Sequence, residues 1–213
     1  MLYTKILNNI KRSIQDPLYF FQSLTAFLRG FIYIFYYRLF TRNIRIGFPF
    51  RAHAPVRIIG PGAVSIGRNC AVYKNVFKGL TIFTYSKKST VSIGNRCLLG
   101  GLTIRCKERV EIGERTMTAI SLIQDSFFMN LAKDSYLSVN GSIPVPKPIF
   151  IGNNVWLGAD SIVLGGSIVG DDCVVGAGSL CFNAEYKEYS LISGNPAKKT
   201  LPIDKLLRLT GAA

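Results

Sequence analysis

A compact apolar side chain recurs at every sixth position near the C-terminal end of the chain. The run consists of Ile151, Leu157, Val163, Val169, Val175 and Cys181. Six matches neither the 3.6-residue period of a helix nor the two-residue alternation of a strand. It is the period of a triangular solenoid, in which each hexad forms one short strand and one turn, and three hexads close a coil. The sequence therefore predicts an all-β solenoid whose repeated apolar side chains point inward.

The cysteines and the single histidine restrict the chemistry of the chain. Cys70, Cys97 and Cys173 each stand four residues after an aliphatic-glycine repeat position, where other repeats place Thr116 and Val155. We expect them to be small core residues, because the slot takes compact side chains. The five cysteines form no C-x-x-C pair, and their odd number suits a reducing compartment such as the cytosol. With His53 as the only histidine, a metal site built on several histidines is excluded.

Three segments follow from composition: a helical segment over 1–43, the solenoid over 44–200 and a short helix or tail over 201–213. The first segment carries a long apolar and aromatic run from Leu18 to Tyr37, interrupted by Arg29 and followed by Arg38. It is interpreted as amphipathic, and three roles stay open: a helix lying on a membrane surface, a cap on the solenoid, or a spanning helix. The net charge of +14 favours an anionic partner.

The hexad pattern lapses over 121–148. This stretch contains no aliphatic-glycine pair, and Pro144, Pro146 and Pro148 close it. A long excursion from a tight solenoid is uncommon unless it is functional. We therefore expect a functional loop here.

Three motifs in one order resemble a known family. They are Pro148-Ile-Phe-Ile-Gly-Asn-Asn-Val-Trp-Leu-Gly-Ala159, then Val169-Gly-Asp-Asp-Cys-Val-Val-Gly-Ala-Gly-Ser179, then Ser193-Gly-Asn-Pro-Ala-Lys198. The chain resembles the bacterial hexapeptide-repeat acyltransferases, in particular the sugar O-acetyltransferases of the maltose, galactoside and nodulation type. The resemblance covers about residues 44 to 200. It implies a left-handed parallel β-helix, a homotrimer, and acetyl-CoA bound in the groove between two subunits.

The resemblance also implies roles for individual residues on the donor side. Trp156 would flank the pantetheine arm of CoA and Ala159 would line its path. Gly176 and Ala177 would offer backbone groups to the pantetheine amides. Lys198 would reach a CoA phosphate, with Lys199 as an added cation beside it.

On the acceptor side the chain departs from the family. Many relatives end a segment of the form Ile-x-Asp-Ser-Asp-x-His on the histidine that serves as general base. The matching residues run from Ile123 to Met129, so Asp125 and Ser126 are kept while Met129 stands at the histidine position. Asp125 and Ser126 are therefore the candidate catalytic residues, with Asp125 the candidate base. His53 is expected to lie roughly 17–20 Å away along the solenoid axis, too far to substitute.

The function predicted from these residues is acetyl-CoA-dependent O-acetylation of a sugar in surface polysaccharide biosynthesis. The acceptor would be a sugar or a lipid-linked saccharide, met at the cytoplasmic face of the inner membrane through residues 1–43. No metal and no nucleic acid are expected. Two alternatives stay open, namely a non-catalytic trimeric binding or scaffold protein on the same fold, and an acyltransferase that uses an acyl carrier protein as donor.

Overall fold

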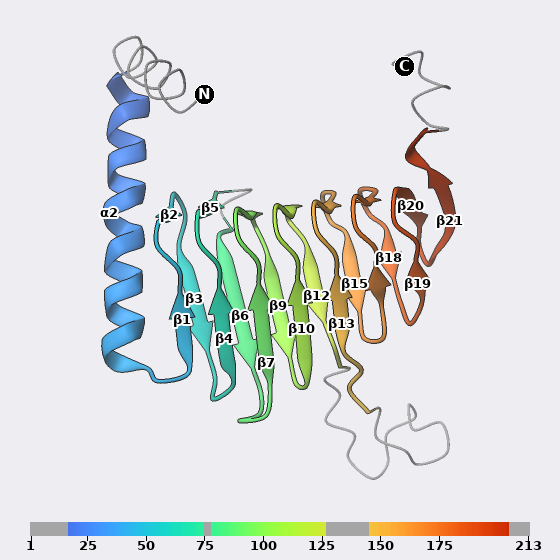
Figure 1. Cartoon of the computed structure of the whole chain (residues 1–213), viewed down its shortest axis with the longest axis horizontal. Coiled ribbons are helices and arrows are strands. Elements are labelled where there is room, and N and C mark those ends of the chain that lie inside the picture. The colour runs from blue at the N-terminus through green and yellow to red at the C-terminus, as the bar shows by residue number, and fades with distance from the viewer. Residues whose placement is uncertain (1–16, 75–77, 127–144, 205–213) are drawn as a thin grey trace.

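A helix and a stack of short strands make up the computed structural model, which describes residues 17–74, 78–126 and 145–204. The helix α2 (Pro17–Phe40) comes first, and the strands then wind into a solenoid (Figure 1). Up to β20, successive strands turn from one sheet to the next, so that each strand pairs in parallel with the strands three places before and after it. Three sheets therefore form the walls of a prism, here named sheets A, B and C.

Through β20 the three sheets take every third strand in turn, and β21 joins sheet B beside β20. Sheet A contains β1 (Ile44–Ile46), β4 (Ala63–Ile66), β7 (Thr90–Ile93), β10 (Arg109–Ile112), β13 (Ile149–Ile151), β16 (Ile168–Val169) and β19 (Glu185–Tyr186). Sheet B contains β2 (Phe50–Ala52), β5 (Cys70–Tyr73), β8 (Leu98–Gly100), β11 (Met117–Ala119), β14 (Trp156–Leu157), β17 (Val174–Val175), β20 (Ser190–Gly194) and β21 (Ala197–Pro202). Sheet C contains β3 (Val56–Ile59), β6 (Leu80–Thr84), β9 (Thr103–Cys106), β12 (Leu122–Gln124), β15 (Ile162–Leu164) and β18 (Leu180–Cys181).

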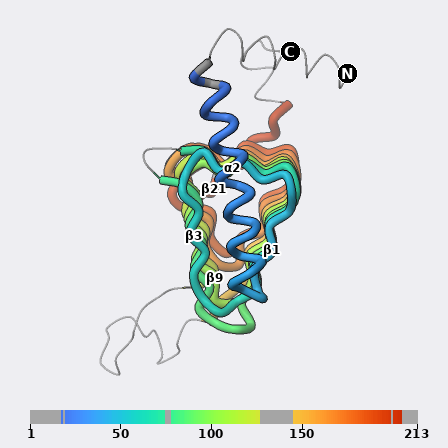
Figure 2. The backbone as a smooth tube through the Cα atoms, turned by 90° about the vertical axis from the view of Figure 1, so that its left-hand side faces the viewer, coloured from blue at the N-terminus to red at the C-terminus, as the bar shows by residue number. Residues whose placement is uncertain are grey.

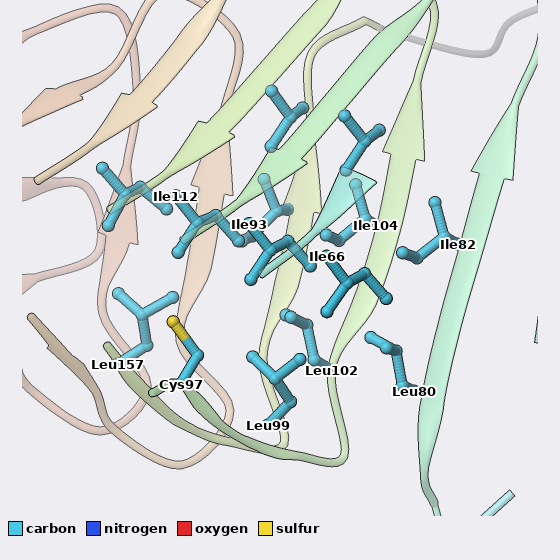
Figure 3. Packing of buried hydrophobic residues seen from close by; sticks show 14 of the residues in the cluster. Ile66, Leu80, Ile82, Ile93, Cys97, Leu99, Leu102, Ile104, Ile112 and Leu157 are labelled. Atoms are coloured by element: carbon cyan, nitrogen blue, oxygen red, sulfur yellow. The ribbon is translucent and has the colours of Figure 1, made fainter. Parts of the chain in front are cut away.

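The predicted inward positions are confirmed. Every member of the hexad run is at most 3% exposed, from Ile151 to Cys181. Parallel pairing aligns Ile66, Ile93, Ile112 and Ile151 in one column inside sheet A. Figure 3 shows Ile66, Ile93 and Ile112 side by side within this core. Burial of one such side chain contributes about 1.5–3 kcal/mol, so the column stabilises each coil against the next.

The cysteines are buried and free, as the repeat register predicted. Cys70, Cys97 and Cys173 are 0% exposed. Each thiol donates a hydrogen bond to a carbonyl of the next coil, for example Cys70 to Gly94 at 3.2 Å and Cys97 to Gly113 at 3.2 Å. Burial raises the pKa of Cys181 to about 11. The cysteines thus behave as core residues.

Helix α2 lies across the open N-terminal end of the solenoid (Figure 2). Ala26 and Tyr37 are buried against the first coil, at 1% and 7% exposure. The hydroxyl of Tyr33 accepts a hydrogen bond from the Val56 N–H at 3.2 Å, and that of Tyr37 accepts one from the Ile58 N–H at 3.1 Å. These bonds satisfy backbone groups at the end of the stack. Among the three roles left open by the sequence, capping is therefore shown.

The face of α2 that points away from the solenoid also carries apolar side chains. The exposed large side chains of the helix are Leu18, Phe20, Phe21, Leu24, Phe27, Leu28, Phe31, Ile32, Phe35, Tyr36, Leu39 and Phe40. One face packs on the solenoid and the other faces outward, with Arg29 and Arg38 between them on the two flanks. In the part of the chain that the structure describes, no helix has the length and hydrophobicity needed to span a membrane.

The C-terminal end of the stack is closed differently. Strand β21 pairs antiparallel with β20, and this hairpin ends at Pro202, just past the predicted domain boundary. An added antiparallel strand covers the edge that β20 would otherwise expose. The short helix or tail predicted over 201–213 begins too early, because residues 201 and 202 belong to β21, and most of the rest lies outside the described residues.

The predicted 121–148 loop also begins too early. Leu122–Gln124 forms strand β12, which pairs with β9 and β15 and buries Ile123 in the core, although no aliphatic-glycine pair marks it. Residues 127–144 of the predicted loop lie outside the described residues.

The cap makes a testable prediction about Tyr37. Replacement of Tyr37 by Phe leaves the buried Ile58 N–H without its acceptor, which costs about 1–3 kcal/mol. Tyr36→Phe is the matched control, because its ring is 51% exposed on the same turn of helix. Urea unfolding of the full chain should show a lower free energy of unfolding for Tyr37→Phe alone. Equal values for the two variants would contradict the cap.

Candidate functional site

Trp156 stands on the outer surface of sheet B. It is 52% exposed, whereas its neighbour Leu157 points inward and is fully buried. In the sheet register Trp156 lies between Met117 of β11 and Val174 of β17. Its indole ring therefore offers a flat apolar surface on the side of the prism, next to the corner where sheet B turns into sheet C.

Two stacked turns form that corner on the C-terminal side of Trp156. The turn at 158–161 lies against the turn at 176–179, since the Gly178 N–H donates to the Ala159 carbonyl at 2.8 Å. A side chain at Gly158 would place its Cβ 2.8 Å from the Ala177 nitrogen, so the two turns approach as closely as backbone allows. Ala177 and Gly178 are exposed. The corner thus presents small residues and accessible backbone.

The next coil adds a cation to the same corner. The hairpin of β20 and β21 is tied to the turn at 176–179 because the Gly194 N–H donates to the Ser179 Oγ at 3.3 Å. Lys198 follows at the start of β21 and is exposed. Lys199 is paired with Ser193 through the backbone, and its side chain is outside the described part.

The residues predicted for the donor side therefore lie together. Trp156, Ala159, Gly176, Ala177 and Lys198 come from three consecutive coils and line one corner of the solenoid. The arrangement places an aromatic face first, exposed backbone next and a cation last along the axis. Such a series suits an elongated ligand with an apolar thioester end, amides in the middle and phosphates at the far end.

Asp125 occupies a different corner and a different environment. It follows β12, where sheet C turns into sheet A, and is 1% exposed. Its carboxylate accepts hydrogen bonds from the backbone N–H groups of Lys107 at 2.8 Å, Glu108 at 2.6 Å and Arg109 at 3.0 Å. The Cys106 thiol donates a further one at 3.4 Å, and burial together with the Asp125 charge raises the pKa of this thiol.

This geometry differs from the sequence prediction for Asp125. A general base must reach the proton of the acceptor hydroxyl with a free lone pair. The oxygens of Asp125 are buried and already engaged by the turn at 106–109. We infer that Asp125 is a structural carboxylate that holds this turn between β9 and β10.

Ser126 and Met129 complete the predicted acceptor segment. Ser126 is 6% exposed, and its Oγ has no hydrogen-bond partner among the described residues. Its carbonyl accepts a hydrogen bond from the Gln124 Nε2 at 2.6 Å. Met129 lies outside the described residues. Ser126 alone cannot act as a base, since the oxygen of a neutral hydroxyl is too weakly basic to take a proton at neutral pH.

His53 is closer to Asp125 along the axis than the sequence suggested, but still remote. It follows β2 in the first coil, while Asp125 follows β12 in the fourth. Three strand spacings amount to about 14 Å. The estimate from sequence was longer because the coils between them hold more than 18 residues each. In the described residues, no group of three or more His, Cys, Asp or Glu side chains is placed to hold a metal ion.

Comparisons with known proteins agree with this fold. Residues 148–183, which include Trp156, Ala159, Gly176 and Ala177, match the family described as bacterial transferase hexapeptide (six repeats). A chloramphenicol acetyltransferase of Agrobacterium fabrum is 36% identical over 72 residues, which are 34% of each chain. One of Klebsiella aerogenes is 41% identical over 49 residues, 23% of each chain. The matches thus span about a third or less of these curated relatives.

Solved structures show the same architecture over more of the chain. The polySia-specific acetyltransferase NeuO superposes with a TM-score of 0.60 at 23% identity, covering 75% of this chain and 70% of its own. A mutant of the N-acyltransferase AntD of Bacillus cereus, solved with dTDP and coenzyme A, gives 0.54 at 15% identity, covering 79% and 90%. The predicted left-handed parallel β-helix is confirmed. The match to the hexapeptide transferase family itself covers residues 148–183.

The structural role of Asp125 can be tested with an isosteric variant. Asp125→Asn removes the charge that three backbone N–H groups share, and we expect the free energy of unfolding to fall by about 2–3 kcal/mol. Asp160→Asn is the control, because Asp160 is exposed. Urea unfolding measures both. A variant that keeps full stability while losing catalytic turnover would instead identify Asp125 as the base.

Proposed function

We propose that this protein is an acyltransferase that moves an acetyl group from acetyl-CoA to a sugar hydroxyl. The observation that carries the proposal is the alignment of Trp156, the turns at 158–161 and 176–179, and Lys198 along one corner. The partial relatives are acetyltransferases by name. A Vibrio cholerae hexapeptide-repeat acetyltransferase solved with acetyl-CoA has the same fold, with a TM-score of 0.50 at 20% identity, covering 64% of this chain and 68% of its own.

The order of these residues along the corner would orient a bound CoA molecule along the solenoid axis. Lys198 at the C-terminal end would bind a phosphate of CoA, with Lys199 beside it. Gly176 and Ala177 would meet the pantetheine amides, and Ala159 and Trp156 would line the arm. The thioester would then point toward the N-terminal coils. The acceptor hydroxyl must therefore approach from the side of the solenoid that α2 caps.

The transfer step needs little from the protein beyond positioning. The acceptor oxygen forms a bond to the thioester carbonyl carbon, the carbon–sulfur bond breaks, and the hydroxyl proton passes through solvent to the departing CoA thiolate. Loss of general-base assistance typically slows such a step by about 10²–10⁴-fold. Because Asp125 is engaged by the backbone, orientation of the two substrates supplies the remaining rate.

A homotrimer would complete the groove. Sheet B carries a row of outward apolar side chains in register, namely Leu98, Met117, Trp156, Val174 and Leu191. Met117 and Trp156 are 45% and 52% exposed in the single chain. A second copy placed against this row would enclose the pantetheine arm between two subunits, and closed threefold symmetry would satisfy every such surface.

Contact with a membrane surface would bring the enzyme to its acceptor. The outward face of α2 is a continuous apolar strip with arginines on both flanks, the composition of a helix that lies at a lipid interface. Basic residues near that end would attract the anionic lipids of a cytoplasmic leaflet. The proposed acceptor is accordingly a sugar or a lipid-linked saccharide at the cytoplasmic face of the inner membrane.

One observation favours a second candidate, a trimeric binding or scaffold protein without catalysis. The only carboxylate in the matching acceptor segment, Asp125, is occupied by backbone N–H groups. Such a protein would bind CoA but would not turn it over. The net charge of +14 also suits an acidic acyl carrier protein as an alternative donor.

Binding of the donor is the first test. Trp156 is the only tryptophan of the chain, so its fluorescence should change on titration with acetyl-CoA. We expect Lys198→Ala to weaken binding by roughly 3–30-fold through the loss of a charge-assisted phosphate contact. Lys187→Ala is the control, an exposed lysine at another corner. Absence of any fluorescence or calorimetric signal at millimolar acetyl-CoA would refute the CoA-dependent function.

Membrane contact predicts a second result. Phe35→Asp places a charge in the outward strip of α2, where the native side chain is 60% exposed. Cosedimentation with phosphatidylcholine–phosphatidylglycerol vesicles should fall at least tenfold, because a charge at an apolar interface is costly. Val145→Asp, 78% exposed in the segment that leads into β13 and far from α2 in the chain, should leave vesicle binding unchanged. Equal binding by both variants would argue against the helix as the membrane contact.

A further inference from the structure

A pocket of about 480 Å³ lies between α2 and the first two coils. Its lining residues are Gln22, Thr25 and Arg29 from the helix, and His53, Tyr73 and Lys74 from the solenoid. The helical residues are spaced three and four apart and so share one flank of α2. That flank lies between the face packed on the solenoid and the outward apolar strip. The pocket therefore opens beside the surface proposed to meet lipid.

The pocket is lined by cationic side chains, and none of its described lining residues is acidic. Arg29 and Lys74 are part of the lining, and both Arg29 and Arg51 act electrostatically on His53. The sequence between residues 17 and 107 contains fourteen lysines and arginines but no aspartate or glutamate. A concave site of positive potential raises the local concentration of anions.

The pKa of His53 reflects the positive charge around this pocket. Burial, Arg51 and Arg29, in that order, lower its pKa below the ordinary value of 6.5. The ring stacks on Tyr73 with centroids 4.8 Å apart and planes 9° from parallel, which fixes its orientation. A neutral imidazole held in this way donates one hydrogen bond to a ligand, while Gln22 and Thr25 add uncharged polar groups.

We infer that this pocket binds a phosphate group, and that in the proposed function it holds the phosphate of a phosphorylated, membrane-linked saccharide acceptor. Arg29 and Lys74 supply the cations, and His53, Gln22 and Thr25 supply the hydrogen-bonding groups. The Tyr73 side of the stacked pair offers an apolar wall to the first sugar ring. The assignment of the phosphate to the acceptor rests on the proposed function, whereas the phosphate site itself does not.

The place of the pocket along the solenoid supports this assignment. Tyr73 ends β5 at the corner between sheets B and C, the corner on which the CoA residues lie. Three strand spacings separate β5 from β14, which carries Trp156, or about 14 Å. A saccharide extending from the pocket along this corner would reach the thioester end of CoA. The apolar strip of α2 would meanwhile receive the lipid chain.

The single histidine makes the test direct. The pH titration of the His53 ring is followed by NMR in the full-length protein, with and without inorganic phosphate. A bound phosphate dianion stabilises the imidazolium form, so we expect the pKa of His53 to rise and the effect to saturate. Arg29→Gln should raise the pKa of His53 without ligand, since the arginine charge lowers it, and should weaken phosphate binding about five- to tenfold. Lys88→Gln, exposed and outside the pocket, is the matched control.

A second arm separates free phosphate from a lipid headgroup. Phosphatidylcholine vesicles with and without phosphatidic acid are cosedimented with the native chain and the two variants. Preference for phosphatidic acid that Arg29→Gln removes and Lys88→Gln keeps supports the site, whether or not inorganic phosphate also binds. The phosphate site would be overturned if phosphate left the pKa of His53 unchanged and Arg29→Gln bound the vesicles as the native chain does. Trp156 fluorescence in the same samples keeps failure of the pocket distinct from failure of the CoA site.

Discussion

Close contact between the backbones of successive coils at one corner determines the rest of the structure. Where sheet A turns into sheet B, Gly67, Gly94, Gly113 and Gly152 lie one above the other. A Cβ on Gly113 would come within 2.5 Å of the Gly152 carbonyl carbon, so no other residue fits at this spacing. The turn itself is completed two residues later by Asn69, Arg96, Arg115 and Asn154, whose φ angles lie between 54° and 60°. The glycines therefore serve close approach rather than positive φ. Because the coils stack in this fixed register, equivalent residues of successive coils also align at the other corners. Trp156 therefore lies in line with the turns at 158–161 and 176–179 and with Lys198.

The repeat period predicted the solenoid and its inward side chains, because a six-residue period constrains local and long-range structure together. The residues proposed to bind CoA were named from the family resemblance, and the fold brings Trp156, Ala159, Gly176, Ala177 and Lys198 to one corner. Other features depend on contacts that sequence spacing does not reveal. The sequence does not reveal which apolar face of α2 packs on the solenoid. The structure shows it, because the hydroxyls of Tyr33 and Tyr37 accept hydrogen bonds from the first coil. Asp125 matches a catalytic motif, yet three backbone N–H groups from 107–109 reach it only in the folded chain. The phosphate pocket joins Arg29, His53 and Tyr73, which no motif connects.

Charge is distributed unevenly along the solenoid axis. Basic residues without acids fill the N-terminal coils, while all but one of the acidic residues follow residue 107. Helix α2 lies at the same basic end (Figure 1), and its outward side chains are apolar. An anionic membrane would therefore attract the capped end and orient the solenoid axis away from the bilayer. In that orientation the proposed phosphate pocket would lie nearest the lipid, the thioester of bound CoA would lie above it, and the CoA phosphates would lie farthest away.

Binding of acetyl-CoA at one corner of this solenoid can be measured directly. Hydrogen-exchange mass spectrometry of the full-length protein, with and without acetyl-CoA, detects it because bound ligand slows exchange of the amides it covers. We expect slower exchange in peptides that span 156–159, 176–179 and 194–199, and no change in the turn at 106–109. Protection absent from that corner, or confined to another face of the solenoid, would contradict it.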